Sequence, residues 1–128
     1  MKNYEIFVSI ASYKDSELIN TINDLYENAK NPNEIRCVVF NQTDFTQFED
    51  HKLYFGDRKV EVYSVDYRNT KGVCWVRHKI QSYIENEKYY LQIDAHMRFG
   101  KDWDEKFKIY LNECNSLKPV LTFYPAPY

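Results

Sequence analysis

The sequence predicts an α/β domain built around a mainly parallel β-sheet. Apolar runs rich in β-branched and aromatic residues alternate with segments in which apolar residues recur at helical spacing. The order strand, helix, strand, loop, strand, helix, strand, helix, strand is typical of sheets joined by right-handed crossover connections. Because 128 residues is an ordinary size for one domain, we expect residues 1–128 to form a single domain.

The composition is that of a folded protein and excludes several classes of partner. Hydrophobic residues make up 44% of the chain and aromatic residues 17%, which is enough for a packed core. The net charge of -2 gives no reason to expect a nucleic acid or an anionic membrane as a partner. The apolar run near the N-terminus is too short for a signal peptide or a membrane span, so we expect a cytoplasmic protein. Cys37, Cys74 and Cys114 are expected to be buried or half-buried free thiols.

The first half of the chain predicts two strands with a helix between them. Residues 4–10 (YEIFVSI) and 35–40 (IRCVVF) have the apolar, β-branched character of buried strands. From about residue 15 to residue 30, apolar residues fall on one helical face, and Asn31 and Pro32 end the helix. These apolar residues are Leu18, Ile19, Ile22, Leu25, Tyr26 and Ala29. Residues 41–56 have no clear periodicity and are expected to form a loop with room for one short helix.

The second half predicts a strand, a helix and another strand. Residues 59–65 alternate between apolar and polar side chains, which predicts a third strand that ends at Asp66. After the turn residues 69–72, apolar side chains at helical spacing predict a helix; they are Val73, Val76, Ile80, Tyr83 and Ile84. Residues 89–93 (YYLQI) form the fourth predicted strand.

The last helix carries the clearest start signal in the chain. Asp102 and Glu105 are spaced as the N-cap and third residue of a capping box. The predicted apolar face of this helix consists of Trp103, Phe107, Tyr110, Leu111 and Cys114. Asn115 and Ser116 end the helix, and residues 120–124 are predicted to form a last short strand.

Polar groups appear directly after each of the first four predicted strands. They lie in the segments Ala11, Ser12 and Tyr13; Asn41 and Gln42; Asp66, Tyr67 and Arg68; and Asp94 to Arg98. In an open parallel sheet, the ligand binds beyond the carboxyl ends of the strands, so these segments should converge. A rim of carboxylates, amides, an aromatic ring, an imidazole and guanidinium groups is typical of a nucleotide site. The chain has neither the glycine-rich dinucleotide motif nor a P-loop, so phosphates must be neutralised in another way.

Asp94 and His96 are the candidate metal ligands. In an extended segment, residues i and i+2 point to the same side about 7 Å apart, so these two side chains could close on one divalent cation. A diphosphate would complete the coordination shell. Carboxylate and phosphate oxygens suit Mg²⁺ or Mn²⁺, and an imidazole moves the preference toward Mn²⁺. The alternative is that Asp94 caps a turn and His96 is an ordinary polar residue.

Two further features each allow two interpretations. Arg77 falls about one turn into a helix that begins near this edge, where it could reach a phosphate or a carboxylate. It could equally be an exposed helix arginine. The pair Asp102 and Asp104 is a literal D-x-D motif, but capping and the helix dipole explain both carboxylates without a metal.

Four blocks of the chain resemble a known family. They are IFVSIASYKDSEL at 6–18, the pattern TI..L...A.NP..I from Thr21 to Ile35, the segment G...VR from Gly72 to Arg77, and YYLQIDAHMRFGKDWD at 89–104. With them the chain resembles the first half of the polypeptide hydroxyproline N-acetylglucosaminyltransferase family, which are glycosyltransferases of the GT-A fold. The resemblance covers nearly the whole chain. It departs at Val73 and Val76, where the family often has Pro and Ala.

The resemblance implies a three-layer, Rossmann-like GT-A domain that binds a UDP-sugar donor. Asp94 and His96 stand where the family's metal motif lies, and would hold Mn²⁺ or Mg²⁺ against the diphosphate of UDP-N-acetylglucosamine. Ala11, Ser12, Tyr13 and Gln42 would line the uridine pocket, and Arg77 would lie near the diphosphate or near Asp94. The cation would stabilise the departing UDP while an acceptor hydroxyl, on a protein, attacks the anomeric carbon. Since a GT-A enzyme needs a further segment for its acceptor, we expect a truncated chain that is the donor-binding half.

Two other functions stay open at this point. One is a non-catalytic module that keeps the fold and binds a sugar nucleotide or a protein. The other is a metal-dependent hydrolase of nucleotide sugars with Asp66 as the base, although Asp66 could instead contact a ribose or end its strand. If the domain is truncated, an exposed edge strand or apolar residues near 120–124 could bring copies together as a homo-oligomer.

Overall fold

The computed structural model describes residues 3–44, 54–55, 58–122 and 124–128. A sheet of four parallel strands has the order β5-β2-β1-β6; its members are β1 (Ile6–Tyr13), β2 (Ile35–Thr43), β5 (Glu61–Asp66) and β6 (Tyr89–Asp94). Two short strands, β3 (Tyr54–Phe55) and β4 (Arg58–Lys59), form a separate antiparallel pair. The predicted α/β class with a mainly parallel sheet is therefore confirmed.

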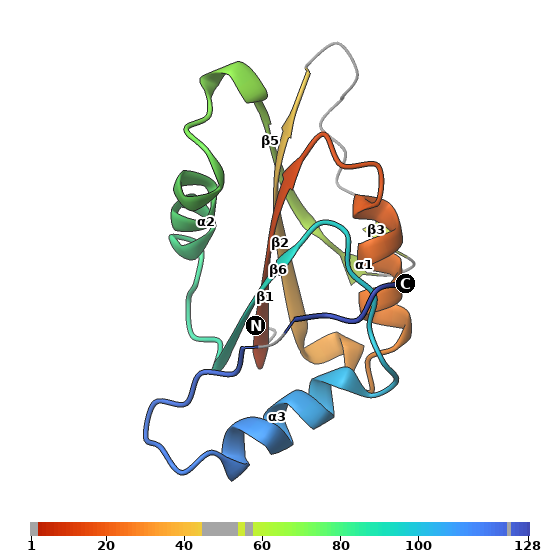
Figure 1. Ribbon diagram of the computed structural model, residues 1–128, viewed down its shortest axis with the longest axis vertical. Coiled ribbons are helices and arrows are strands. Elements are labelled where there is room, and N and C mark those ends of the chain that lie inside the picture. Colours follow the sequence, from red (N-terminus) through yellow and green to blue (C-terminus); the bar gives the residue numbers. More distant parts are fainter. Residues whose placement is uncertain (1–2, 45–53, 56–57, 123) are drawn as a thin grey trace.

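Helices on both sides of the sheet give the three layers. Helix α1 (Leu18–Glu27) and helix α2 (Val73–Gln81) cover opposite faces (Figure 1). Helix α3 (Trp103–Glu113) lies below the sheet, at the end where β1 and β2 begin (Figure 1). Two short 3-10 helices, Pro32–Glu34 and Tyr67–Asn69, precede β2 and follow β5. No helix in these described ranges has the length and apolar character needed to cross a bilayer.

The largely apolar character of β1 is explained by burial on both faces of the sheet. Successive side chains of a strand point to opposite faces. Ile6, Val8 and Ile10 therefore pack with Leu18, Ile22 and Leu25 under α1. Phe7 packs on the other face with Val38, Phe40, Val76 and Ile80 under α2.

The second strand is longer than its sequence pattern predicts. Asn41, Gln42 and Thr43 were expected to lie in a loop, but they continue β2 and are buried. Their backbones pair with β1 and β5, in the registers Ser12 to Asn41 and Thr43 to Asp66. Pairing on both sides therefore overrides the polar character of the side chains. The short helix allowed within residues 41–56 would fall mainly on 45–53, which lie outside the described residues.

The first and last predicted helices both begin differently from the prediction. Asp15 lies before α1, because its carboxylate accepts a hydrogen bond from the Glu17 amide (2.9 Å) and so closes a turn ahead of the helix. The capping box of α3 is wrong: Asp102 has a left-handed backbone (φ 58°) and makes no side-chain cap. An N-cap needs an extended backbone to aim its side chain at the first turn. Glu105 instead forms an ion pair with Lys30 (2.6 Å).

The segment after α3 is also not as predicted. Residues 120–122 and 124, expected to be a strand, have no regular secondary structure, and Val120 and Tyr124 are exposed. Nearby Pro119, Pro125 and Pro127 lack the amide hydrogen that strand pairing uses.

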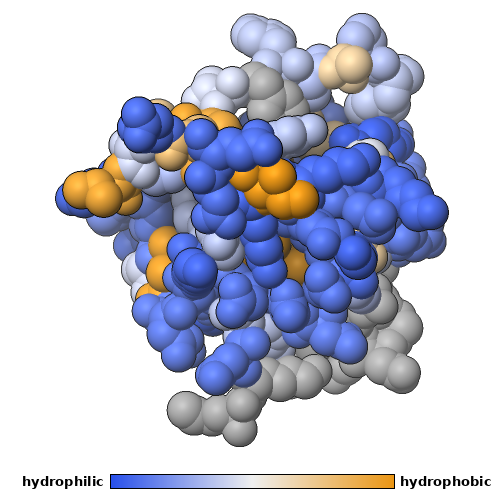
Figure 2. All heavy atoms as spheres, turned by 90° about the horizontal axis from the view of Figure 1, so that it is seen from below, coloured by the Kyte–Doolittle hydropathy of each residue, from blue (hydrophilic) through white to orange (hydrophobic). Residues whose placement is uncertain are grey.

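The surface over α3 is less apolar than its predicted face. Trp103 and Phe107 pack on the core as predicted, but Tyr110 is exposed. Figure 2, which views the molecule from below, shows a largely hydrophilic face with separate small hydrophobic groups. All three cysteines are free thiols, as expected; Cys37 is buried and Cys114 half-buried, whereas Cys74 is exposed, against the prediction.

Candidate functional site

The polar segments predicted to converge do lie along one edge of the sheet. Tyr13 pairs with Gln42, Thr43 pairs with Asp66, and Ala11 pairs with Asp94. All four strands are parallel, so their carboxyl ends meet at this edge. The fold therefore brings together the residues that the sequence singled out.

A cavity of about 410 Å³ lies at the ends of β1 and β2. Ala11, Tyr13 and Gln42, all predicted site residues, line it together with Tyr67, Thr70 and Gly72. The rings of Tyr13 and Tyr67 meet edge to face with centroids 6.0 Å apart. Two aromatic rings beside a buried amide suit a flat, polar ligand such as a nucleobase.

Tyr67 belongs to a segment predicted to lie at this edge, whereas three other residues that line this cavity, Thr70, Gly72 and Val73, were not predicted from the sequence. Tyr67, Thr70 and Gly72 reach it because the 3-10 helix Tyr67–Asn69 turns the chain back after β5. The sequence pattern marked Thr70 and Gly72 only as turn residues and Val73 only as an apolar residue of the following helix. Gly72 has a φ of 93°, which favours glycine, and α2 begins directly after it. The positive end of the α2 dipole therefore lies beside the cavity.

Gln42 supplies the buried floor of this cavity, whereas Ser12, whose side chain alternates to the other face of β1, is not among the lining residues. Gln42 is 3% exposed, and its side-chain amide donates to the Ser12 carbonyl (3.3 Å). The Ser12 hydroxyl is buried and has no hydrogen-bond partner among the described residues. Buried hydroxyls without partners are uncommon in proteins, and a ligand or water often supplies the missing bond.

Lys14 places a positive charge next to the same aromatic pair. Its ammonium group lies 3.6 Å from the centre of the Tyr67 ring. The residue has a φ of 46°, in the left-handed region that non-glycine residues rarely adopt. Its amide donates to the Gln42 carbonyl (3.0 Å), which holds the chain in this conformation as it leaves β1.

Arg77 lies beside Asp94. One guanidinium nitrogen, Nη2, is 3.2 Å from Oδ1 of Asp94, and the Arg77 side chain is only 29% exposed. Its Nε is buried and has no partner within the described part of the chain. Arg77 is thus turned toward the sheet edge from α2, and is not the freely exposed helix arginine of the alternative interpretation.

His96 makes its contact with a residue that sequence reasoning did not assign to the site. Its Nδ1 lies 2.8 Å from Oδ2 of Asp15, which sits between β1 and α1. The hydrogen bond to Asp15, with a further contribution from the charge of Asp94, raises the pKa of His96. Burial alone would raise the pKa of Asp15, but its bonds to His96 and to the Glu17 amide lower it overall.

The extended geometry predicted for Asp94 and His96 is wrong. Strand β6 ends at Asp94, and the chain bends at Ala95 and His96. Thr21 of α1 causes this bend: its hydroxyl donates to the Ala95 carbonyl (2.7 Å) and accepts from the Met97 amide (2.9 Å). The bend sends the two side chains toward different partners, Arg77 and Asp15.

Asp94 and His96 each keep one free donor atom of a kind that binds divalent cations. Among the described residues, Oδ2 of Asp94 and Nε2 of His96 make no hydrogen bond, and both side chains are more than half exposed. No cluster of three or more His, Cys, Asp or Glu occurs in the described ranges. A cation here would therefore take most of its ligands from phosphate and water, as Mg²⁺ commonly does.

Two other acidic residues are already engaged. Asp66 accepts bonds from the Arg68 amide (2.9 Å) and Nε (2.9 Å), and these contacts lower its pKa to about 2. Such a weak base is poorly suited to the hydrolase hypothesis. Asp104 is 2% exposed and accepts from the amides of Lys30 and Asn31, both at 2.8 Å. This supports the structural interpretation of the D-x-D motif at 102–104.

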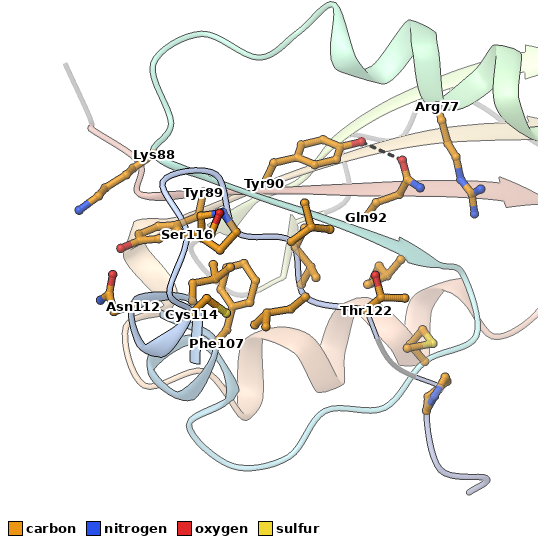
Figure 3. Close-up of a pocket in the computed structure, with 18 of the residues that line it drawn as sticks. Arg77, Lys88, Tyr89, Tyr90, Gln92, Phe107, Asn112, Cys114, Ser116 and Thr122 are labelled. Carbon is orange, nitrogen blue, oxygen red and sulfur yellow. Dashed lines mark hydrogen bonds between the residues drawn. The ribbon is translucent and has the colours of Figure 1, made fainter. Parts of the chain in front are cut away.

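A larger cavity of about 940 Å³ lies between β6, α3 and the C-terminal segment (Figure 3). Its lining includes Tyr89, Leu91, Phe107, Leu111 and Leu121. Figure 3 shows Arg77, on α2, at the opposite end of this space from Lys88. Arg77 and Asp94 border it, so the cavity meets the polar sheet edge there. The sequence analysis did not predict this space, because it depends on the course of the chain after α3.

The chain matches the model of a known family. The model of a family described as Glycosyltransferase (GlcNAc) matches residues 5–50 and 43–128. These ranges include every residue of the sheet edge described above. No curated protein and no solved structure matches the chain.

Proposed function

Because the chain belongs to the Glycosyltransferase (GlcNAc) family, we propose that it binds a UDP-sugar donor for transfer of N-acetylglucosamine, or a related sugar, to a hydroxyl group. Membership of this family supports glycosyl transfer as the general type of reaction. The identity of the donor, the cation and the acceptor are the parts proposed here. Each rests on the chemistry of the sheet edge.

The cavity at the ends of β1 and β2 is the proposed nucleoside pocket. The Tyr13 and Tyr67 rings offer apolar surface for a base, and the Gln42 amide is buried beneath them. Ser12, which the resemblance places in this pocket, carries its hydroxyl on the other face of β1 and is not among the lining residues. Ala11 and Gly72 leave room, because neither carries a large side chain. Asp66, which could contact the donor's ribose, is held by Arg68 in this structure, where it ends β5 and begins the turn of Tyr67.

The diphosphate is proposed to lie between this pocket and Asp94. Lys14, Arg77 and the N-terminal end of α2 all bring positive charge to that region. Arg77 neutralises Asp94 in this structure, and its Nε has an unused hydrogen. A phosphate arriving with a cation would give Arg77 a second acceptor and release Oδ1 of Asp94.

Asp94 and His96 are proposed to hold Mn²⁺, or Mg²⁺, against the diphosphate. When bound, the cation would supply Lewis-acid stabilisation of the departing UDP. The chain's own residues orient the donor: Asp94 and His96 at the end of β6 fix one side of the diphosphate, and Arg77 binds the other. The acceptor is proposed to be a protein hydroxyl. Self-association through the exposed Val120 and Tyr124 also stays a proposal.

One observation carries the proposal beyond family membership. It is the meeting, at one sheet edge, of free donor atoms on Asp94 and His96 with Arg77 and with an aromatic, amide-floored cavity. A module that binds only a protein would have no need for this combination.

Isothermal titration calorimetry tests the proposed donor. UDP-N-acetylglucosamine is titrated into the chain with Mn²⁺ and then with a chelator, beside UDP-glucose and GDP-mannose. We expect Mn²⁺-dependent binding that is selective for uridine donors. Equal binding of GDP-mannose would contradict the uridine pocket, and no binding by a folded chain would contradict the donor-binding proposal.

A further inference from the structure

Asp15 contacts His96, although neither the sequence analysis nor the family match gives Asp15 a role in the site. The two residues are 81 positions apart, and they join the turn before α1 to the bend after β6. The hydrogen bond measures 2.8 Å. It reaches the residue proposed to be the second metal ligand, so its effect on that imidazole matters for the site.

We propose that Asp15 is a positioning residue that keeps His96 in the tautomer able to bind the cation. A neutral imidazole has one N–H and one lone pair. When Nδ1 donates its hydrogen to Asp15, the lone pair is left on Nε2, which is the nitrogen without a hydrogen bond in the described structure. Metal-binding histidines very commonly donate their other N–H to a carboxylate in this manner. This inference rests on the proposed function, because it assumes that His96 meets a cation.

Of the two side chains, that of Asp15 is the more restrained. Its other carboxylate oxygen, Oδ1, accepts from the Glu17 amide (2.9 Å), and its side chain is 21% exposed. The His96 side chain is 59% exposed, so without Asp15 little would restrain its ring. The backbone hydrogen bond therefore orients Asp15, and Asp15 orients His96.

A purely structural tie between the two segments is the competing explanation, and the chain supplies a matched control. Glu17 and Arg98 form an ion pair that joins the same two segments, and both side chains are partly exposed. Glu17→Gln weakens that tie without touching His96. If Asp15 only held the segments together, then Asp15→Ala and Glu17→Gln should act alike.

The first readout needs no cation. ¹⁵N–¹H NMR spectra of the His96 ring, recorded above its pKa, report which nitrogen carries the hydrogen. We expect Nδ1–H in the native chain and Nε2–H, the form that predominates for a free imidazole in water, in Asp15→Ala. Asp15→Asn keeps an acceptor oxygen and should retain part of the Nδ1–H form. Glu17→Gln should match the native spectrum.

The second readout is the affinity for Mn²⁺ in the presence of UDP, measured by electron paramagnetic resonance of free Mn²⁺. Loss of such an outer partner commonly weakens metal binding about 10- to 100-fold. We expect a loss of that size for Asp15→Ala, a smaller loss for Asp15→Asn and none for Glu17→Gln. Urea unfolding of each variant verifies that it is folded.

The outcomes separate this inference from the proposed function. Native Mn²⁺ binding that Asp15→Ala leaves unchanged, or that Glu17→Gln lowers equally, overturns the role of Asp15 and leaves the donor site standing. An Nε2–H tautomer in the native chain also overturns it. If the native chain with UDP binds no Mn²⁺ at all, the proposed cation site fails and the inference falls with it.

Discussion

Replacing Asp104 should destabilise the fold and leave the candidate site intact. The carboxylate is 2% exposed and accepts two backbone hydrogen bonds, from Lys30 and Asn31, both at 2.8 Å. Hydrogen bonds to a charged group contribute about 1.5 to 3 kcal/mol each. Since Lys30 and Asn31 are exposed residues, water can reach their amides in the variant, and the low end of the range applies. We therefore expect Asp104→Ala to lower the free energy of unfolding by about 3 kcal/mol.

Urea unfolding measured by circular dichroism gives this value. Asp104→Asn keeps one acceptor oxygen, so it should lose about half as much, roughly 1.5 kcal/mol. Asp102→Asn is the matched control from the same motif. Asp102 has a left-handed backbone, which asparagine tolerates well, so the free energy of unfolding of this variant should equal that of the native chain. Full stability of Asp104→Ala together with loss of Mn²⁺-dependent donor binding would refute this account and make residues 102–104 the metal motif.

Three further predictions concern ionisation and buried polar groups. Arg68 holds the pKa of Asp66 at about 2, so the stabilising effect of this carboxylate is present above its ordinary pKa of 3.8 and is lost as the pH falls toward 2. NMR titration of the Asp66 carboxyl should show this value in the native chain and a higher one in Arg68→Ala; an unchanged pKa in the variant would contradict the assignment to Arg68. Glu87→Ala removes the 2.7 Å hydrogen bond to Arg36, which still contacts Glu61 and the Tyr83 carbonyl, and should cost about 1.5 to 3 kcal/mol by urea unfolding; no loss would mean that Glu61 and Tyr83 together satisfy Arg36. Ser12→Ala should leave both stability and the affinity for UDP-N-acetylglucosamine in calorimetry unchanged, because the hydroxyl has no partner among the described residues and Ser12 does not line the nucleoside pocket; weaker binding would place the hydroxyl in that pocket.

Local patterns in the sequence were sufficient to predict the sheet and its main helices. Residues 6–10 are buried on both faces, so a continuous apolar run marks their strand without ambiguity. Helix α1 has a single apolar face that packs on this strand, so its period is clear. Elements of this kind satisfy burial and local preference with the same residues.

The errors arose where long-range contacts override local preference. Asn41 to Thr43 are polar yet lie in β2, because strands on both sides bind their backbones. The capping box failed because Asp102 donates its amide to the Asn28 carbonyl (2.7 Å) and adopts a left-handed backbone there. Neither partner is visible in a local sequence window.

The same reasoning explains what could be predicted of the candidate site. The position of Ala11, Tyr13, Gln42 and Asp94 at strand ends follows from the parallel sheet alone. The pairing of His96 with Asp15 could not be predicted, because it depends on the bend that Thr21 holds at Ala95. A rule based on residues i and i+2 of a strand has no validity beyond the last residue of that strand.

The central claim is that Asp94 holds a cation against the diphosphate of a uridine donor. Calorimetric titration of UDP-N-acetylglucosamine with Mn²⁺ into the native chain and into Asp94→Ala tests it most directly, with circular dichroism to show that both are folded. Asp94 lies at a strand end and is more than half exposed, so its loss should spare the fold. We predict binding by the native chain that disappears in Asp94→Ala and on addition of a chelator. Equal binding by the two proteins, or binding that persists in the chelator, would contradict the account.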